Sequence, residues 1–329
     1  MTDTVQVAID DRMRLLAALL AVTTWPEDEQ RRKAHGTHIH ARNTRRRLQT
    51  YDKHPAVVIL QGLLDRGVPL EELFGYVLQL EWPALTGGEQ PTWAPPAWPR
   101  HLVAFYQDTG LAQWWQEEAR HWEEARQQVE KLFASAQLHT FLEPFVGPIP
   151  DTLIFLPNLC YPTDISLGAA VDGRLYCITP PRVAVGNNPP WPFDDDPAHL
   201  YRAALMQYGR LLLRRYLRAH ADALAEASAQ PLPVTPTFTA LYPTWEAQLL
   251  ALVGLSLVVI YLQDCVSEQE AQAYVLMERK VHGLTELPGA VSVMRRYLRG
   301  RQDGTYREFA DFLPHFGKHL RVARTIMAL

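Results

Sequence analysis

Histidines are the residues best suited to chemistry in this chain, and three of them gather in the segment HGTHIHAR as His35, His38 and His40. Neutral imidazole is a common ligand of zinc and other transition metals, so this spacing could supply a metal site. On a helix, however, the three positions do not share one face, and no carboxylate stands at a matching position. The residues therefore favour a solvated loop or helix start, and the basic run at 44–47 favours a solvated face.

A second pair, His315 and His319 in HFGKH, has the i, i+4 spacing that puts two imidazoles on one helical face. The segment lacks the glutamate that zinc hydrolases carry directly after the first histidine, and Lys318 adds a competing positive charge. This pair, or the histidines at 35–40, would supply the ligands if the protein were an active metal-dependent hydrolase.

Other candidate groups have simpler explanations. Asp194, Asp195 and Asp196 with His199 could bind a cation through oxygen ligands, but capping of a helix that begins at Pro197 accounts for the aspartates with fewer assumptions. The sequence contains no GxSxG, P-loop or GxGxxG motif.

The three cysteines, Cys160, Cys177 and Cys265, are an odd number without CxxC spacing. They favour reduced thiols in a cytosolic protein over a disulfide framework. Cys160 and Cys177 lie in or near predicted strands, where a small buried thiol is commoner than a nucleophile.

Composition predicts a soluble globular protein of 329 residues, 47% of them hydrophobic. A net charge of −4 gives no overall attraction to nucleic acid or to an anionic membrane. The apolar stretch near the N-terminus is expected to be a helix and not a signal sequence. The longest apolar run, at 249–262, is shorter than the ~20 residues that cross a bilayer, so we expect a buried central helix.

The elements that must position these side chains are mostly helices. In the first part of the chain we expect helices near 10–22, 55–80 and 101–139, the last two separated by the proline-rich segment 89–99. Aromatic side chains recur at helical offsets within the third helix, a pattern typical of core packing. They are Phe105, Tyr106, Trp114, Trp115 and Trp122.

Strands are expected only between 150 and 180. Segments 152–156 and 175–179 are rich in β-branched and aromatic residues, and Asp172-Gly173 predicts a hairpin turn before the second of them. We therefore predict an α+β, mostly helical fold with a helical region at 1–145, and a region at 146–329 made of a small antiparallel sheet and helices. The two regions are expected to pack as one compact unit. The later helices are predicted at 197–228, 243–263, 266–282, 286–300 and 305–328.

Several separated segments follow one another in a suggestive order. IDDRMRLLAALLAV at 9–22 comes first, a segment containing His54-Pro55-Ala56-Val57 follows, and helices at 197–228 and from Trp245-Glu246 come later. In this order they resemble an uncharacterised bacterial family, a domain of unknown function with zincin-like metallopeptidase features. That family begins with D-P-R-x-E-L-L and continues with H-P-A-V, an H-E-F-x-H helix and a downstream glutamate.

The resemblance implies a metal site whose chemistry is missing here. The H-E-F-x-H positions fall on Met206, Gln207, Tyr208, Gly209 and Arg210. A zincin needs two neutral imidazoles to hold the metal and a carboxylate to take a proton from its water. Met206 is a weak ligand, Gln207 cannot act as a base, and Arg210 repels a cation.

The downstream glutamate of the family corresponds to Glu246. We expect Met206, Gln207, Arg210 and Glu246 to mark a degenerate site without catalytic residue, metal or cofactor, in which Arg210 and Glu246 form an ion pair where a zincin has zinc.

On the same resemblance, the protein is expected to be a catalytically inactive, zincin-like scaffold that acts as a cytoplasmic binding or regulatory protein. Its partner would be a peptide or protein bound near the small sheet by strand addition, and not a membrane or nucleic acid. Two alternatives remain: an assembly subunit with a contact surface in its Trp- and Pro-rich N-terminal half, and an active, peptidase-like metal hydrolase using His315 and His319.

Overall fold

The computed structural model describes residues 4–184, 186 and 188–328, and the chain divides into two compact units. The sheet unit comprises Thr4–Ala136 and Asp151–Leu200. The helical unit is built from Gln137–Pro150 and Tyr201–Leu329. The strands therefore belong with the N-terminal helices, whereas the sequence placed them in a region beginning at residue 146.

The described strands form a single sheet in the order β1-β2-β4-β3. They are β1 (Gln6–Val7), β2 (Thr152–Pro157), β3 (Leu167–Val171) and β4 (Arg174–Thr179). The fold is α+β and mostly helical, as predicted.

The predicted hairpin is confirmed, since β3 and β4 are antiparallel and Asp172 and Gly173 join them with φ of 47° and 71°. The prediction of a wholly antiparallel sheet is wrong, because β1 with β2 and β2 with β4 are parallel pairs. Composition and periodicity identify strands but do not fix their direction.

The loop 158–166 joins β2 to β3 across the end of β4. Pro157 at the end of β2 pairs with Thr179 at the end of β4, and Leu167 at the start of β3 pairs with Ile178. Both ends of the loop therefore lie at the carboxyl end of the parallel strands. The chain must pass over β4 to reach the outer position of β3.

The side chain of Asn158 forms two hydrogen bonds to backbone groups of this loop. Its Oδ1 accepts a hydrogen bond of 2.9 Å from the Cys160 amide, and its Nδ2 donates one of 3.3 Å to the carbonyl of Pro162. Residues 158–163 are all buried, so these bonds satisfy backbone groups that water does not reach.

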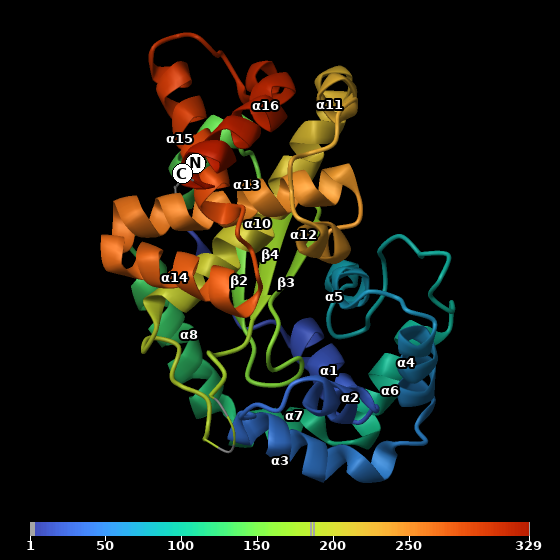
Figure 1. The fold of residues 1–329 in the computed structure, drawn as a ribbon. Coiled ribbons are helices and arrows are strands. Elements are labelled where there is room, and N and C mark those ends of the chain that lie inside the picture. Colours follow the sequence, from blue (N-terminus) through green and yellow to red (C-terminus); the bar gives the residue numbers. More distant parts are fainter. Residues whose placement is uncertain (1–3, 185, 187, 329) are drawn as a thin grey trace. The chain divides into compact units, whose positions relative to one another are not determined.

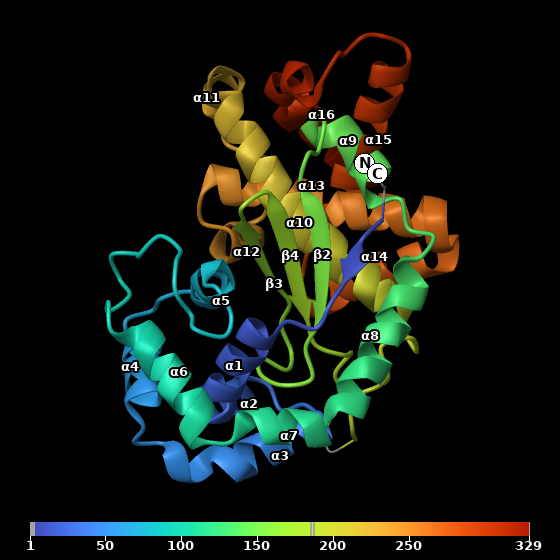
Figure 2. The same cartoon turned by 180° about the vertical axis from the view of Figure 1, so that it is seen from behind.

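Helices surround the sheet within the sheet unit. They are α1 (Asp11–Leu20), α2 (Trp25–Arg32), α3 (Ile39–Leu48), α4 (Pro55–Asp65), α5 (Leu70–Gln79), α6 (Trp98–Asp108), α7 (Leu111–Glu117) and α8 (Ala119–Phe133). Helix α8 packs on β1 and β2 at one side of the sheet, and α5 packs on β3 at the other (Figure 1, Figure 2). Trp114, Trp115 and Trp122 are buried, which confirms the predicted aromatic core.

Two predicted helices are interrupted by glycine. Gly67 has φ of 75° and separates α4 from α5, and Gly110 has φ of 64° and separates α6 from α7. A right-handed helix cannot continue through this left-handed conformation, which glycine adopts without steric cost. The helices expected at 55–80 and 101–139 are therefore each built from shorter ones.

The helical unit consists of helices packed on one another. They are α9 (Leu138–Val146), α10 (Pro197–Ala219, whose first residues belong to the sheet unit), α11 (Ala221–Ser228), α12 (Pro236–Leu241), α13 (Trp245–Tyr261), α14 (Glu268–Val281), α15 (Leu287–Gln302) and α16 (Phe309–Ala328). A π-helical turn, Leu262–Val266, follows α13 directly. Helix α13 contacts α14 and α15, and α16 contacts α11 and α15 (Figure 1).

Helix α13 is the buried helix that the apolar run predicted. Leu252, Leu255 and Val259 are 0%, 4% and 5% exposed. In the part of the chain that the structure describes, the segment Trp245–Val266 is the one helix apolar and long enough to cross a membrane, and 78% of its most apolar stretch is buried in protein. This burial is what the core helix of a soluble protein requires.

Two glycines with open space around them should respond to alanine in opposite ways. Gly173→Ala places a side chain at positive φ in the β3–β4 turn and should destabilise the protein by about 1 kcal/mol. Gly62→Ala lies within α4 and should stabilise it by about 0.5–1 kcal/mol, because alanine has the higher helix propensity. Urea unfolding measures both, and equal effects of one sign would contradict the assigned backbone conformations.

Candidate functional site

The positions that resemble a zincin motif lie in the middle of α10. Asp196 caps this helix by accepting a 3.0 Å hydrogen bond from the His199 amide, which confirms the capping interpretation of the aspartate run. Tyr208 and Gly209 are buried, whereas Met206 is partly exposed. The aromatic and small positions of the motif therefore serve packing.

Helices α10 and α13 meet through glycine on both sides. A methyl group at Gly254 would lie 3.3 Å from Sδ of Met206, and one at Gly209 would lie 3.6 Å from Cδ1 of Leu257. The Met206 sulfur thus rests on the backbone of α13. Where a zincin would present an imidazole, this side chain fills space between two helices.

The expected ion pair between Arg210 and Glu246 is not formed in the described chain. Glu246 pairs with Nε of Arg214 at 3.9 Å, and Nη2 of Arg210 donates to Oε1 of Gln207 at 3.1 Å. Glu246 lies in the first turn of α13 with 44% of its side chain exposed. Water and the positive helix N-terminus stabilise its charge, so it does not need a buried guanidinium.

His315 and His319 share a face of α16 without forming a ligand set. Their ring centroids are 6.4 Å apart, and His319 stacks on Phe312 at 5.5 Å. Burial lowers the pKa of His319, with further lowering from the positive charges of Arg296 and Lys318. No carboxylate among the described residues joins the pair to complete a metal site.

The three histidines at 35–40 have three different environments. His38 caps α3, where its Nδ1 accepts a 3.1 Å hydrogen bond from the His40 amide. His40 lies 2.7 Å from Glu118 through Nδ1 and accepts a bond from the Trp122 indole through Nε2. His35 lies in the loop before α3 and belongs to the one cluster of possible metal ligands found among the described residues. The expected loop and helix start are confirmed, since α3 begins at Ile39. The expectation that the segment is solvated is wrong, because His35 and His40 are 6% and 2% exposed.

The buried cysteines are not poised as nucleophiles. Burial raises the pKa of the Cys160 and Cys177 thiols to about 12 each, so both stay protonated at neutral pH. All three cysteines are free, as predicted, and Cys265 is exposed.

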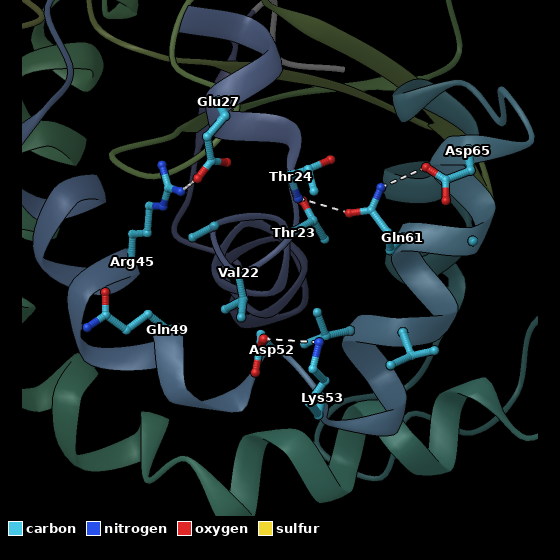
Figure 3. Close-up of a pocket in the computed structure, with 14 residues that line it drawn as sticks. Val22, Thr23, Thr24, Glu27, Arg45, Gln49, Asp52, Lys53, Gln61 and Asp65 are labelled. Carbon is cyan, nitrogen blue, oxygen red and sulfur yellow. Dashed lines mark hydrogen bonds and ion pairs between the residues drawn. The ribbon is translucent and has the colours of Figure 1, made fainter.

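A groove of about 640 Å³ opens between α1, α2, α3 and α4 in the sheet unit (Figure 3). The apolar part of its lining includes Val22, Val57 and Val58, and the remaining lining residues are mostly polar. These polar groups pair with one another: Gln61 accepts from the Thr24 amide at 2.9 Å and donates to Asp65 at 2.8 Å, Glu27 pairs with Arg45, and Lys53 pairs with Asp52 at 3.4 Å. Apolar side chains beside amide, carboxylate and ammonium groups are what a binding groove needs.

The ion-pair assignment at α10 and α13 can be tested by double-mutant cycles. The pair between Arg214 and Glu246 is solvent-exposed, so alanine substitutions should reveal a coupling of about 0.5 kcal/mol or less that shrinks as salt is added. Arg210 and Glu246 should show no coupling. A coupling above about 1 kcal/mol between Arg210 and Glu246 in urea unfolding would contradict this assignment and indicate a buried ion pair between them.

Comparisons with models of known protein families, with curated proteins and with solved structures found no match to this chain. The resemblance to a zincin-like family therefore stays a proposal. Functional inference rests on the geometry of the chain's own residues.

Proposed function

We propose that this chain is a zincin-like scaffold without hydrolytic zinc chemistry, and that it acts as a cytoplasmic binding or regulatory protein. The observation behind the proposal is that the side chains at the motif positions pack or pair with neighbouring residues. Met206 packs on Gly254, and the Glu246 carboxylate is paired with Arg214. Neither ligand type nor geometry there suits a catalytic metal.

The order of elements supports the scaffold half of the proposal. A mixed sheet with an antiparallel outer strand precedes α10, and α13 follows with a glutamate in its first turn. This is the order of sheet, active-site helix and glutamate helix that the resemblance implies. Tyr208 and Gly209 keep the aromatic and small character of the motif because they pack inside the helical unit.

The groove between α1 and α4 is the better candidate for the binding surface. Strand addition needs an open strand edge, but β1 at one edge of the sheet is only two residues long, and β3 at the other edge packs against α5. The groove instead combines apolar lining residues with amide and carboxylate groups. A short peptide segment fits this chemistry, with a small apolar side chain on Val58 and backbone amides bonded to the polar lining residues.

Restoring the zinc motif tests the scaffold. The triple variant Met206→His/Gln207→Glu/Arg210→His should bind about one more Zn²⁺ per chain than the wild type, because two imidazoles at i and i+4 would then lie on one face of α10, as in the zincin motif. The matched control with alanine at the same three positions should gain none. Metal content after dialysis is the readout, and the absence of any gain in a folded triple variant would count against a zincin-like arrangement.

Peptidase assays of the wild type test the second part of the proposal, that the protein has no hydrolytic zinc chemistry. The proposal predicts no hydrolysis of fluorogenic peptides with or without added Zn²⁺. Chelator-sensitive hydrolysis that is lost in His315→Ala/His319→Ala would support the alternative of an active hydrolase.

The groove makes a separate prediction. Peptides selected from a random display library against the wild type should bind Val58→Glu at least about tenfold more weakly, since a charged side chain in the lining disfavours contact with an apolar anchor. Val281→Glu replaces another exposed valine, in the helical unit, and should leave binding unchanged. Equal loss in both variants, measured by fluorescence polarisation, would place the ligand elsewhere.

A further inference from the structure

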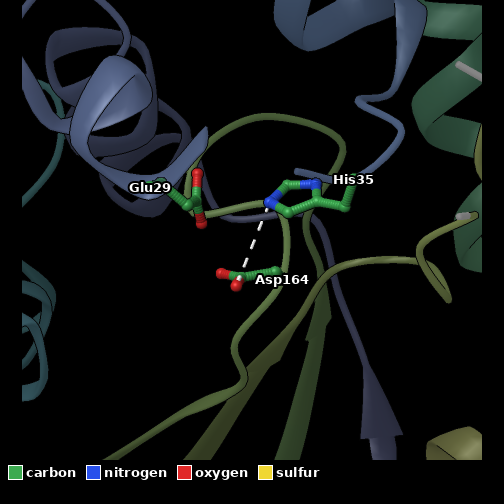
Figure 4. Close-up of side chains that lie close together, drawn as sticks. All are labelled: Glu29, His35 and Asp164. Carbon is green, nitrogen blue, oxygen red and sulfur yellow. Dashed lines mark ion pairs between the residues drawn. The ribbon is translucent and has the colours of Figure 1, made fainter. Parts of the chain in front are cut away.

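Three potential metal ligands, two of them close in sequence and the third far along the chain, converge in the sheet unit (Figure 4). Glu29 belongs to α2, His35 to the loop before α3, and Asp164 to the loop that crosses β4. One ligand atom from each lies within 4.8 Å of the other two. Their side chains point toward a common space between the two loops and the helix.

The His35 ring is oriented as a ligand would be. Its Nδ1 lies 3.0 Å from the carbonyl oxygen of Gly36, a contact that requires the proton on Nδ1. The lone pair is then on Nε2, which is buried, has no hydrogen-bond partner, and faces Oδ2 of Asp164 at 3.9 Å. Metal-bound histidines commonly donate their other ring N–H to a carbonyl in this way.

The two carboxyl groups lack a positive partner. Glu29 is 2% exposed and accepts hydrogen bonds from the amide and hydroxyl of Thr163 at 3.4 and 3.3 Å. No lysine or arginine among the described residues forms an ion pair with Glu29 or Asp164. Burial, followed by the hydrogen bond and negative charge of Asp164, raises the pKa of Glu29 to about 8. Two carboxyl groups within 4.8 Å of each other and of an unpartnered imidazole nitrogen favour a cation between them.

The backbone around His35 is held firmly enough to keep this arrangement. Gln30, next to Glu29 on α2, donates to the His35 carbonyl at 3.2 Å and to the Thr37 hydroxyl at 3.1 Å. The Gly36 amide donates to the Ala184 carbonyl at 2.8 Å. A methyl group at Gly36 would lie 2.0 Å from the backbone oxygen of Asn188, so only glycine fits there. Support from outside the ligand set is what a metal site needs to keep its geometry.

We propose that Glu29, His35 and Asp164 bind a divalent transition-metal ion such as Zn²⁺. One imidazole nitrogen and two carboxylate oxygens suit Zn²⁺, Mn²⁺ or Fe²⁺ better than Ca²⁺ or Mg²⁺, which prefer all-oxygen sites with more ligands. Around zinc, ligand atoms lie about 3.4 Å apart, so small side-chain rotations close the cluster. The ion would link α2 to the crossing loop, and the inference is independent of the function proposed for α10 and α13.

Metal titration tests the site. Wild-type protein stripped with EDTA and desalted should bind about one Zn²⁺ in isothermal titration calorimetry, and Co²⁺ should give visible absorption bands of a nitrogen and oxygen site. Zn²⁺ should also raise the Tm, because a ligand of the folded state stabilises it. His35→Gln, Glu29→Gln and Asp164→Asn should each weaken Zn²⁺ binding at least about 100-fold, since even supporting residues of metal sites contribute 10–100-fold.

Matched variants keep the test specific. His121→Gln replaces an exposed histidine of the same unit, and His315→Gln/His319→Gln replaces the other histidine pair; both should bind Zn²⁺ as the wild type does. Glu29→Gln retains an acceptor for Thr163, so circular dichroism should show a folded protein even if His35→Gln does not fold.

Absence of Zn²⁺ and Co²⁺ binding by the wild type would overturn the proposal. Binding that survives in folded Glu29→Gln and Asp164→Asn would also overturn it. Alanine at 206, 207 and 210 should not alter this binding, which separates it from the scaffold proposal.

Discussion

The parallel pairing of β2 with β4 is the constraint on which much of the sheet unit depends. Because β3 follows β2 in sequence but lies outside β4, loop 158–166 must cross the carboxyl end of the sheet. A buried crossing is tolerable only if its backbone groups are bonded, and Asn158 does this from inside the loop. The same crossing brings Asp164 and Thr163 to Glu29 on α2.

Local signals in the sequence were sufficient for part of this structure. The Asp172-Gly173 turn, the cap at Asp196 and the buried helix α13 each depend on neighbouring residues or on one apolar run, and all were predicted. The parallel β1–β2 pair was not, since its partners lie far apart and β1 is only two residues long. No pattern in one sequence states which distant strands will pair or in which direction.

In the candidate sites too, features that depend on neighbouring residues could be predicted, and contacts between distant segments could not. Periodicity found α10 and placed Met206 and Arg210 on it, but the partner of Glu246 depended on helix packing and proved to be Arg214. The sequence marks His35 as a possible ligand, but its neighbours favour a loop or helix start, because the three histidines do not share a helical face and no carboxylate stands at a matching position. The carboxylates near His35 come from the preceding helix and from a loop 129 residues later, a convergence that only the fold reveals.

The π-helical turn Leu262–Val266 after α13 has a further consequence. A π turn holds about one residue more than an α turn, so it shifts the angular phase of the chain by roughly 100° just before the helix ends at Ser267, whose φ of −164° and ψ of 152° are extended. Here the shift coincides with a change of surroundings, from Leu262 at 0% exposure to the exposed residues 263–265. The helix therefore ends where the chain passes from the protein core to solvent. Helix α14 begins with a cap of its own, in which the Ser267 hydroxyl accepts from the Glu270 amide at 3.1 Å, so the apolar face of α13 and the exposed start of α14 belong to two separately terminated helices.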